Sequence, residues 1–212
     1  MSNKINSISK PALNRFPDYL NYLNLMKNKG LIQISSTMIA EHLKLNPIKV
    51  RKDLELTGAI GKPRSGFLIE ELIMKITDLL GYNNSSEAVL VGVGQLGKTL
   101  LSYEQFADYG LSIVVAFDKQ EALWNTEVKG KKVLPMEKCK DLINRMKIHI
   151  GIITVTADDA QEVCDLMVDS GILAIWNFAP VHLTVPEHIL VQNENMAASL
   201  ALLSKRLKER IQ

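Results

Sequence analysis

Three glycines and one acidic residue have the types and spacing of a site for phosphate and ribose groups. Gly92, Gly94 and Gly97 follow the apolar run 88–91 and precede a stretch with helical periodicity. After a buried strand, the first glycine permits a tight turn, the second lets backbone N–H groups approach a pyrophosphate, and the third lets a helix pack closely. Asp118 ends the next apolar run, 21 residues after Gly97, where a carboxylate accepts ribose hydrogen bonds.

This pattern predicts an α/β fold with a Rossmann-type, doubly wound parallel sheet that binds a dinucleotide. The alternative is a glycine-rich turn that only packs a helix onto a sheet. Asp118 would repel the additional phosphate of NADP(H), whereas the charge of the adjacent Lys119 would counteract that repulsion.

The composition is that of a globular chain with room for one large domain or two small ones. Of its 212 residues, 47% are hydrophobic, without an apolar run long enough to cross a bilayer. Residues 1–4 lack the apolar stretch of a signal peptide, so we expect a cytoplasmic protein with no membrane partner. Cys139 and Cys164 lie in helical patterns and outside any Cys/His cluster, which favours packed free thiols and no metal.

Charge is distributed unevenly along the chain. Residues 1–80 hold 12 Lys and Arg against 7 Asp and Glu, whereas residues 81–212 hold 13 against 16. A basic segment beside a mildly acidic one indicates that the first part meets a polyanion. The polar stretch 82–86 is typical of a linker.

The basic part has the pattern of a winged helix-turn-helix. Helices are expected over 10–29, where Pro17 kinks or restarts the helix, over 38–43 and over 47–57. The last of these would enter the major groove of DNA, and the hairpin 58–67 would form the wing. The expected DNA-binding residues are Lys49, Arg51 and Lys52 on the helix and Lys62 and Arg64 in the wing. The alternative is a helical cap whose charges are merely solvated.

Three motifs in this order resemble the Rex family of bacterial redox-sensing transcriptional repressors. Val50–Leu54 resembles the core of that family's recognition helix, Val91–Gly97 its nucleotide loop, and Trp176–Pro180 its segment near the nicotinamide. The resemblance implies a winged-helix DNA-binding domain over 1–81, a Rossmann domain over 82–193, and a C-terminal helix over 194–212 that is exchanged between the two subunits of a homodimer.

The resemblance also implies a repressor that binds double-stranded operator DNA when free or bound to NAD⁺ and is released by NADH. That response needs a two-state dimer in which NADH binds one state more tightly. The residues implied for the dinucleotide are Gly92, Gly94, Gln95, Leu96, Gly97, Asp118, Lys119, Thr154, Val155, Asn177, Phe178, Ala179 and Pro180. Arg15, Tyr103 and Asn195 fit a state-dependent polar cluster of the family, with Asn195 in place of an Asp.

Several positions depart from the family pattern. Glu55–Thr57 replaces the usual Ser-Tyr-Phe, which predicts a different operator, and the wing arginine is moved by one position. Thr156 replaces a proline beside the nicotinamide, and Met196 stands where an aromatic residue is frequent. The sequence therefore also permits a DNA-binding paralogue with a structural nucleotide or a different ligand.

An NAD-dependent dehydrogenase is the alternative from another functional class. It requires a general acid or base beside the nicotinamide, and His182 is the one candidate by position. No partner that would orient this histidine is evident in the sequence, and the first 80 residues would have no role. We therefore expect no enzyme and no catalytic residue.

Overall fold

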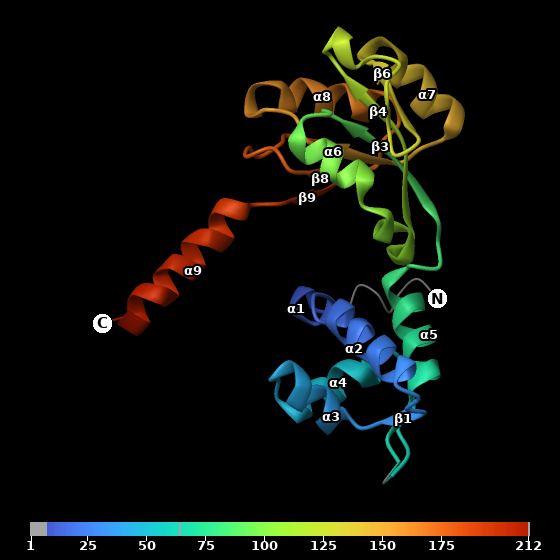
Figure 1. Cartoon of the computed structure of the whole chain (residues 1–212), viewed down its shortest axis with the longest axis vertical. Coiled ribbons are helices and arrows are strands. Elements are labelled where there is room, and N and C mark those ends of the chain that lie inside the picture. The colour runs from blue at the N-terminus through green and yellow to red at the C-terminus, as the bar shows by residue number, and fades with distance from the viewer. Residues whose placement is uncertain (1–7, 64, 212) are drawn as a thin grey trace. The chain divides into compact units, whose positions relative to one another are not determined.

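The computed structural model of the chain describes residues 8–63 and 65–211 (Figure 1). Arg64, which was predicted for the wing, and the N-terminal stretch 1–4 lie outside these residues, as does the side chain of Met196. The chain divides into two compact units, 1–84 and 85–212, which are described separately. Within the described ranges, no helix has the length and apolar character needed to cross a membrane.

Unit 1 is a helical domain closed by a short antiparallel ribbon, which is the arrangement of a winged helix-turn-helix. Its elements are α1 (Lys10–Leu13), α2 (Phe16–Asn28), β1 (Gln33–Ile34), α3 (Ser36–Leu43), α4 (Pro47–Leu56), β2 (Phe67–Leu68) and α5 (Ile69–Leu80). β1 pairs with β2, and Lys62 forms a bridge with Gly66 inside the hairpin that precedes β2. Helix α4 is the expected recognition helix.

Local signals explain where the helices of unit 1 begin. The helix expected over 10–29 is divided in two, and Pro17, which has no N–H to donate, lies in the first turn of α2. Ser35 caps α3, because its hydroxyl accepts a hydrogen bond from the backbone N–H of Met38 at 3.1 Å. Asn46 caps α4 in the same way, which fixes the start of the recognition helix.

Unit 2 contains a sheet with the order β5-β6-β4-β3-β7-β8-β9, in which β5 and β6 are antiparallel and the other described pairs are parallel. Its strands are β3 (Ser86–Val91), β4 (Leu111–Asp118), β5 (Glu127–Val128), β6 (Lys131–Pro135), β7 (Ile150–Ile153), β8 (Ala174–Asn177) and β9 (Leu190–Asn193). Counted along the chain, the parallel strands stand third, second, first, fourth, fifth and sixth, which is the order of the Rossmann sheet. Ligands bind such sheets where the order reverses, here between β3 and β7.

Helices cover both faces of this sheet. They are α6 (Gln95–Ser102), α7 (Cys139–Met146) and α8 (Ala157–Asp169), with short 3₁₀ turns at Glu104–Tyr109, Glu121–Leu123 and Met136–Lys138. Val89 and Val91 of β3 join the core under α7 and α8, whereas Ala88 and Leu90 join the core under α6. Successive residues of a strand point to opposite faces, so the apolar run 88–91 serves both cores.

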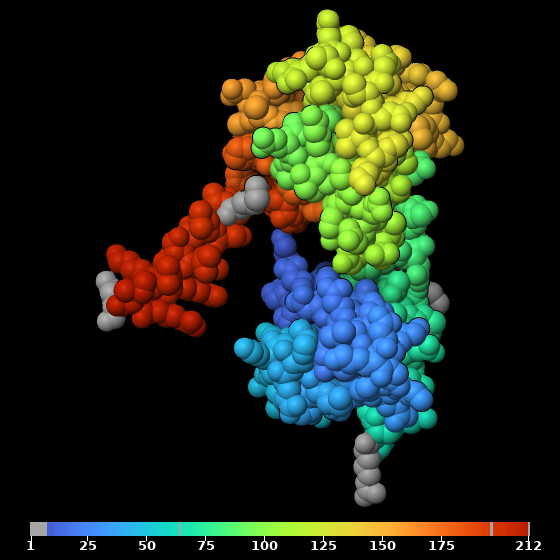
Figure 2. All heavy atoms as spheres, in the orientation of Figure 1, coloured from blue at the N-terminus to red at the C-terminus, as the bar shows by residue number. Residues whose placement is uncertain are grey.

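The C-terminal helix α9 (Met196–Ile211), which is red in Figure 2, carries an apolar stripe. Leu200, Leu203 and Leu207 are 63%, 63% and 55% exposed. An apolar stripe on a helix normally packs against another surface. Exchange of this helix between two subunits stays a prediction.

Both cysteines are free and buried, as expected from their helical patterns. Burial raises the pKa of the Cys139 thiol to about 12 and that of Cys164 to about 11. Because the thiolate is the reactive form, we expect a chromogenic disulfide reagent at pH 8 to modify neither thiol in the folded protein and both in urea. Rapid modification of either thiol in native buffer would contradict this burial.

Candidate functional site

The loop between β3 and α6 is held tightly at two glycines and is open at the third. Gly92 has φ +101°, and a Cβ there would lie 2.8 Å from the carbonyl of Thr154. A Cβ on Gly97 would lie 2.0 Å from the Gly92 oxygen, so only glycine lets α6 approach the strand this closely. A Cβ on Gly94 would meet nothing within 4 Å. The glycine pattern therefore fixes the loop on the protein side and leaves space on the other.

Asp118 ties this loop to the end of β4. Its side chain is buried, Oδ2 accepts a hydrogen bond from the Val93 N–H at 2.6 Å, and Oδ1 accepts one from the Gln120 N–H at 2.8 Å. Its backbone oxygen accepts a third from the Trp124 indole at 2.8 Å. A carboxylate has about four acceptor positions, so room remains for ribose hydroxyls.

A cavity of about 360 Å³ lies at the carboxyl ends of β3, β4 and β7. It contains six of the residues predicted for the dinucleotide, Gly92, Gly94, Asp118, Lys119, Thr154 and Val155. It also contains Val91 of the nucleotide-loop motif, Thr156 at a departure from the family pattern, and residues that the sequence did not single out, Gln120, Met136, Asp159, Glu162, Val163 and Leu166. The last four of these lie on α8, which begins directly after β7. The start of a helix that follows a parallel strand lies on the ligand side of the sheet, and this position could have predicted these four residues.

The remaining predicted residues of the loop have a different place. Gln95, Leu96 and Gly97 form the first turn of α6 and are not among the lining residues of the cavity. No side chain caps this turn, so its backbone N–H groups are available to an anion. Their expected role is to donate backbone N–H hydrogen bonds to the pyrophosphate.

The segment after β8 is held by Asn177. This side chain is fully buried, and its Nδ2 donates to the Val181 oxygen at 2.9 Å and to Asn193 Oδ1 at 2.8 Å. Its Oδ1 accepts a hydrogen bond from the Ala179 N–H at 3.0 Å. The structure does not bring Asn177–Pro180 into the cavity beside Asp118, and it gives Asn177 the role of fixing the turn.

Aromatic rings connect this segment with the end of α6. Phe178 lies 4.8 Å from Trp176 between ring centroids, Trp176 lies 5.6 Å from Phe106, and Phe106 lies 4.8 Å from Tyr103. The Trp176 indole donates to Glu194 Oε1 at 2.9 Å, just before α9 begins. This row of four aromatic rings therefore connects Tyr103 at the end of α6 with Phe178 in the segment after β8, which the sequence predicted as separate parts of the site.

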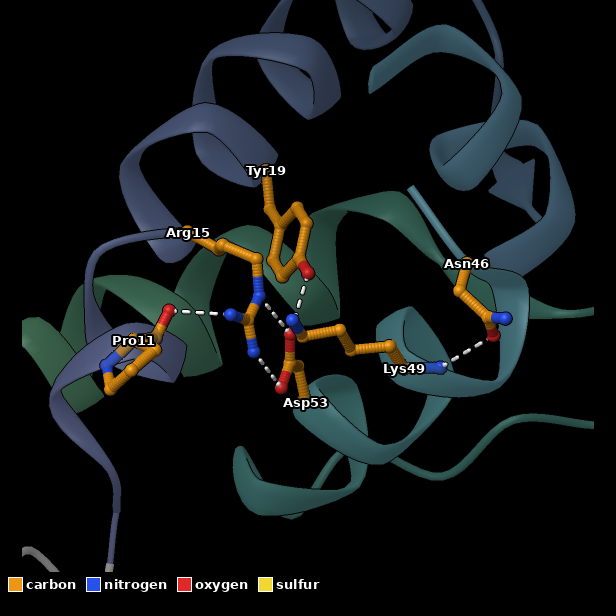
Figure 3. Close-up of polar contacts among 6 residues, drawn as sticks. All are labelled: Pro11, Arg15, Tyr19, Asn46, Lys49 and Asp53. Carbon is orange, nitrogen blue, oxygen red and sulfur yellow. Dashed lines mark hydrogen bonds and ion pairs between the residues drawn. The ribbon is translucent and has the colours of Figure 1, made fainter. Parts of the chain in front are cut away.

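A buried charge holds the recognition helix to α2 (Figure 3). Arg15 Nε and Nη2 donate to the two oxygens of Asp53, each at 2.7 Å, and the Tyr19 hydroxyl donates to Asp53 Oδ2 at 2.6 Å. The Asp53 side chain is 6% exposed. The hydrogen bond with Asp53 raises the pKa of Arg15, while burial and then Asp53 raise that of Tyr19. Arg15 thus stays charged and Tyr19 stays a donor.

The cations predicted for DNA on α4 are all exposed, and Arg51 lies opposite Asp53, whereas Lys49 stands one turn before Asp53 on the same face. Lys49, Arg51 and Lys52 are exposed, whereas Asp53 of the same helix is buried. Arg51 Nε lies 3.7 Å from Glu55 Oε1, one turn further along the helix. Glu55 therefore lies close to a cation that was predicted to contact DNA, in a pair that is open to solvent. Lys62 is exposed in the hairpin.

Comparison with known proteins follows the same division of the chain. A family model described as "CoA binding domain" matches residues 83–181, and one described as "Putative DNA-binding protein N-terminus" matches residues 7–55. The redox-sensing transcriptional repressor Rex of Treponema denticola is 38% identical over 91% of this chain and 92% of its own. Rex of Clostridium beijerinckii is 35% identical over 97% of this chain and 98% of its own. The chain belongs to the Rex family.

Solved structures of the Rex family agree with this membership. A crystal structure of RSP in complex with β-NAD⁺ and operator DNA matches with a TM-score of 0.90 and 32% identity over 96% of this chain and 94% of that one. RSP in complex with β-NADH matches with a TM-score of 0.85 and 31% identity over 96% of both chains. The predicted winged-helix and Rossmann fold is confirmed.

The residues of the expected Rex polar cluster are distributed over both units. Arg15 belongs to unit 1, where it is paired with Asp53. Tyr103 and Asn195 belong to unit 2, where Tyr103 is 43% exposed and Asn195 Oδ1 accepts a hydrogen bond from the Ala198 N–H at 2.9 Å. Their meeting in one cluster stays a prediction. Sequence reasoning missed Asp53 as the partner of Arg15, although an acid among the recognition-helix cations was the available signal.

The Asp53 pair makes a stability prediction. Asp53→Asn leaves the Arg15 charge without its buried counter-charge, so we expect the free energy of unfolding of unit 1 to fall by about 3 kcal/mol. Glu55→Gln is the control on the same helix, because it removes an exposed partner and should cost less than about 0.5 kcal/mol. Urea unfolding followed by circular dichroism measures both. Equal effects would show that Asp53 is not a buried anchor.

Proposed function

We propose that this chain is a homodimeric, DNA-binding transcriptional repressor whose hold on its operator is set by the ratio of NADH to NAD⁺. The observation that carries the proposal is the presence, in one Rex-family chain, of a capped recognition helix with exposed cations and a Rossmann sheet with an open glycine loop. The operator is bound by the free or NAD⁺-bound protein and released when NADH is bound.

The DNA side of the proposal rests on α4. Lys49, Arg51 and Lys52 offer donors to phosphates and to guanine edges in the major groove, and Lys62 and Arg64 extend the contact through the wing. Asp53 holds the helix from behind, so the direction of these cations is fixed by the core of unit 1. RSP, with 32% identity, was crystallised with operator DNA.

The residues of unit 2 fit a dinucleotide. Gly94 leaves open space where a Cβ would stand, the first turn of α6 has uncapped N–H groups for the pyrophosphate, and Asp118 retains acceptor positions for a ribose. The cavity beside Asp118 takes the adenosine end, and Phe178–Pro180 lie on the side of the nicotinamide. NADH and NAD⁺, when bound, differ in the charge and shape of that ring.

Release requires two states of the dimer with different affinities for NADH. The apolar stripe of α9 offers the surface through which two subunits associate. Arg15, Tyr103 and Asn195 are the proposed residues of the state-dependent contact. Because the proposed partner is operator DNA, the cytoplasm is the proposed location.

The alternative functions have less support. His182, the one candidate catalyst, is exposed and is not among the residues that line the cavity. The relatives from Treponema denticola and Clostridium beijerinckii are redox-sensing transcriptional repressors and not dehydrogenases. A Rex-family paralogue with a structural nucleotide is the second candidate, favoured by Asn195, which lacks the charge of the family's Asp.

Fluorescence anisotropy of labelled DNA from upstream of the protein's own gene tests the proposal. We expect NADH to release the DNA at concentrations where NAD⁺ has no effect. Arg51→Gln should weaken binding to the same DNA and leave NADH affinity unchanged, because Arg51 belongs to unit 1. Release by both nucleotides alike, or by neither, would replace the redox sensor with the paralogue.

The glycine loop makes a second prediction. Gly94→Ala places a methyl group in space that is empty in the protein, with φ −70°, so folding should be unaffected. NADH affinity should fall about tenfold or more, because that methyl group lies where the pyrophosphate approaches. Gly97→Ala is the matched comparison and should lower the melting temperature, since its Cβ meets the Gly92 oxygen. Unchanged NADH affinity in Gly94→Ala would remove the loop from the nucleotide site.

A further inference from the structure

Lys119 and Asp159 form an ion pair between two elements that line the adenosine cavity. Lys119 follows Asp118 directly after β4, and Asp159 lies in the first turn of α8. Lys119 Nζ lies 2.7 Å from Asp159 Oδ2 and 2.9 Å from Oδ1. The Thr156 hydroxyl donates to the same Oδ2 at 3.0 Å. Asp159 is therefore held from both sides, while Lys119 is directed towards α8.

The pair is fully charged at neutral pH. The hydrogen bond with Asp159 raises the pKa of Lys119, and the hydrogen bonds from Lys119 and then Thr156 lower the pKa of Asp159. The Lys119 side chain is 69% exposed, so the contribution of the pair to folding stability is small. The pair matters because it sets the position of the positive charge of Lys119.

Lys119 is the single cation among the described residues that line the cavity, where it is accompanied by three carboxylates, Asp118, Asp159 and Glu162. A cation beside the ribose-binding acid is what allows a Rossmann site to accept a 2′-phosphate. In this chain that cation already has a bidentate partner. A 2′-phosphate would meet Asp118 and would have to draw Lys119 away from Asp159.

We propose that Asp159, supported by Thr156, sets the selectivity of this site against dinucleotides with a 2′-phosphate by holding the Lys119 ammonium group. The inference rests on the proposed function in one respect, that the cavity holds the adenosine end of a dinucleotide. Asp118 alone repels the extra phosphate, and Asp159 removes the charge that would compensate for it.

The test compares the dissociation constants of NADPH and NADH, which differ in the 2′-phosphate, by titration of the full-length chain. In Asp159→Asn, Lys119 is freed to meet the 2′-phosphate. The dissociation constant of NADPH divided by that of NADH should therefore fall about tenfold. Glu162→Gln removes the same charge from the same cavity without releasing Lys119, and its ratio should change less than about threefold. Asp159→Asn combined with Lys119→Gln should restore the wild-type ratio or exceed it.

Three results would overturn the inference: an unchanged ratio in Asp159→Asn, an equal fall in Glu162→Gln, or a gain in NADPH affinity that survives the loss of Lys119. The measurement needs no DNA, so it separates the two proposals. If the ratios change as expected while NADH fails to release DNA, the proposed role of Asp159 is supported and the proposed redox sensing is contradicted. If the wild-type chain binds neither dinucleotide, both fall.

Discussion

The backbone oxygen of Gly92 is the point on which the nucleotide side of this protein depends. The Thr154 hydroxyl donates to it at 2.6 Å from the end of β7, and α6 passes so close that Gly97 has no room for a Cβ. This contact therefore fixes α6, β3 and β7 to one another at the position where the strand order of the sheet reverses. The uncapped turn of α6 and the carboxylate of Asp118 take their places from this contact.

The sequence was sufficient to predict the parts of the fold that follow from local pattern. The glycine spacing and the apolar run 88–91 predicted the strand, loop and helix, and the recognition helix expected from residue 47 begins there, after the cap at Asn46. The division of the helix expected over 10–29 follows from Pro17, which lies in the first turn of α2. These features depend on residues close together in the chain, where backbone chemistry decides the outcome.

Contacts between distant residues were not predictable in the same way. Arg15 and Asp53 are 38 positions apart, and Lys119 and Asp159 are 40 apart. Charged residues of both signs are frequent on any surface, so their types alone do not select partners. The strand order shows afterwards why Lys119 meets α8: β4 and β7 flank β3, and the loops after them border one cavity.

The hydrogen bond between the Trp176 indole and Glu194 gives the protein a natural optical reporter. The chain has two tryptophans, and the other, Trp124, donates to the backbone of Asp118 at the adenosine cavity. One indole therefore lies beside each of the two segments proposed for the dinucleotide. Indole emission overlaps the absorption band of a reduced nicotinamide, so quenching by energy transfer reports occupancy, while the emission wavelength of Trp176 reports the strand that leads into α9. Replacing one tryptophan at a time assigns the signal to a single indole, without an attached dye.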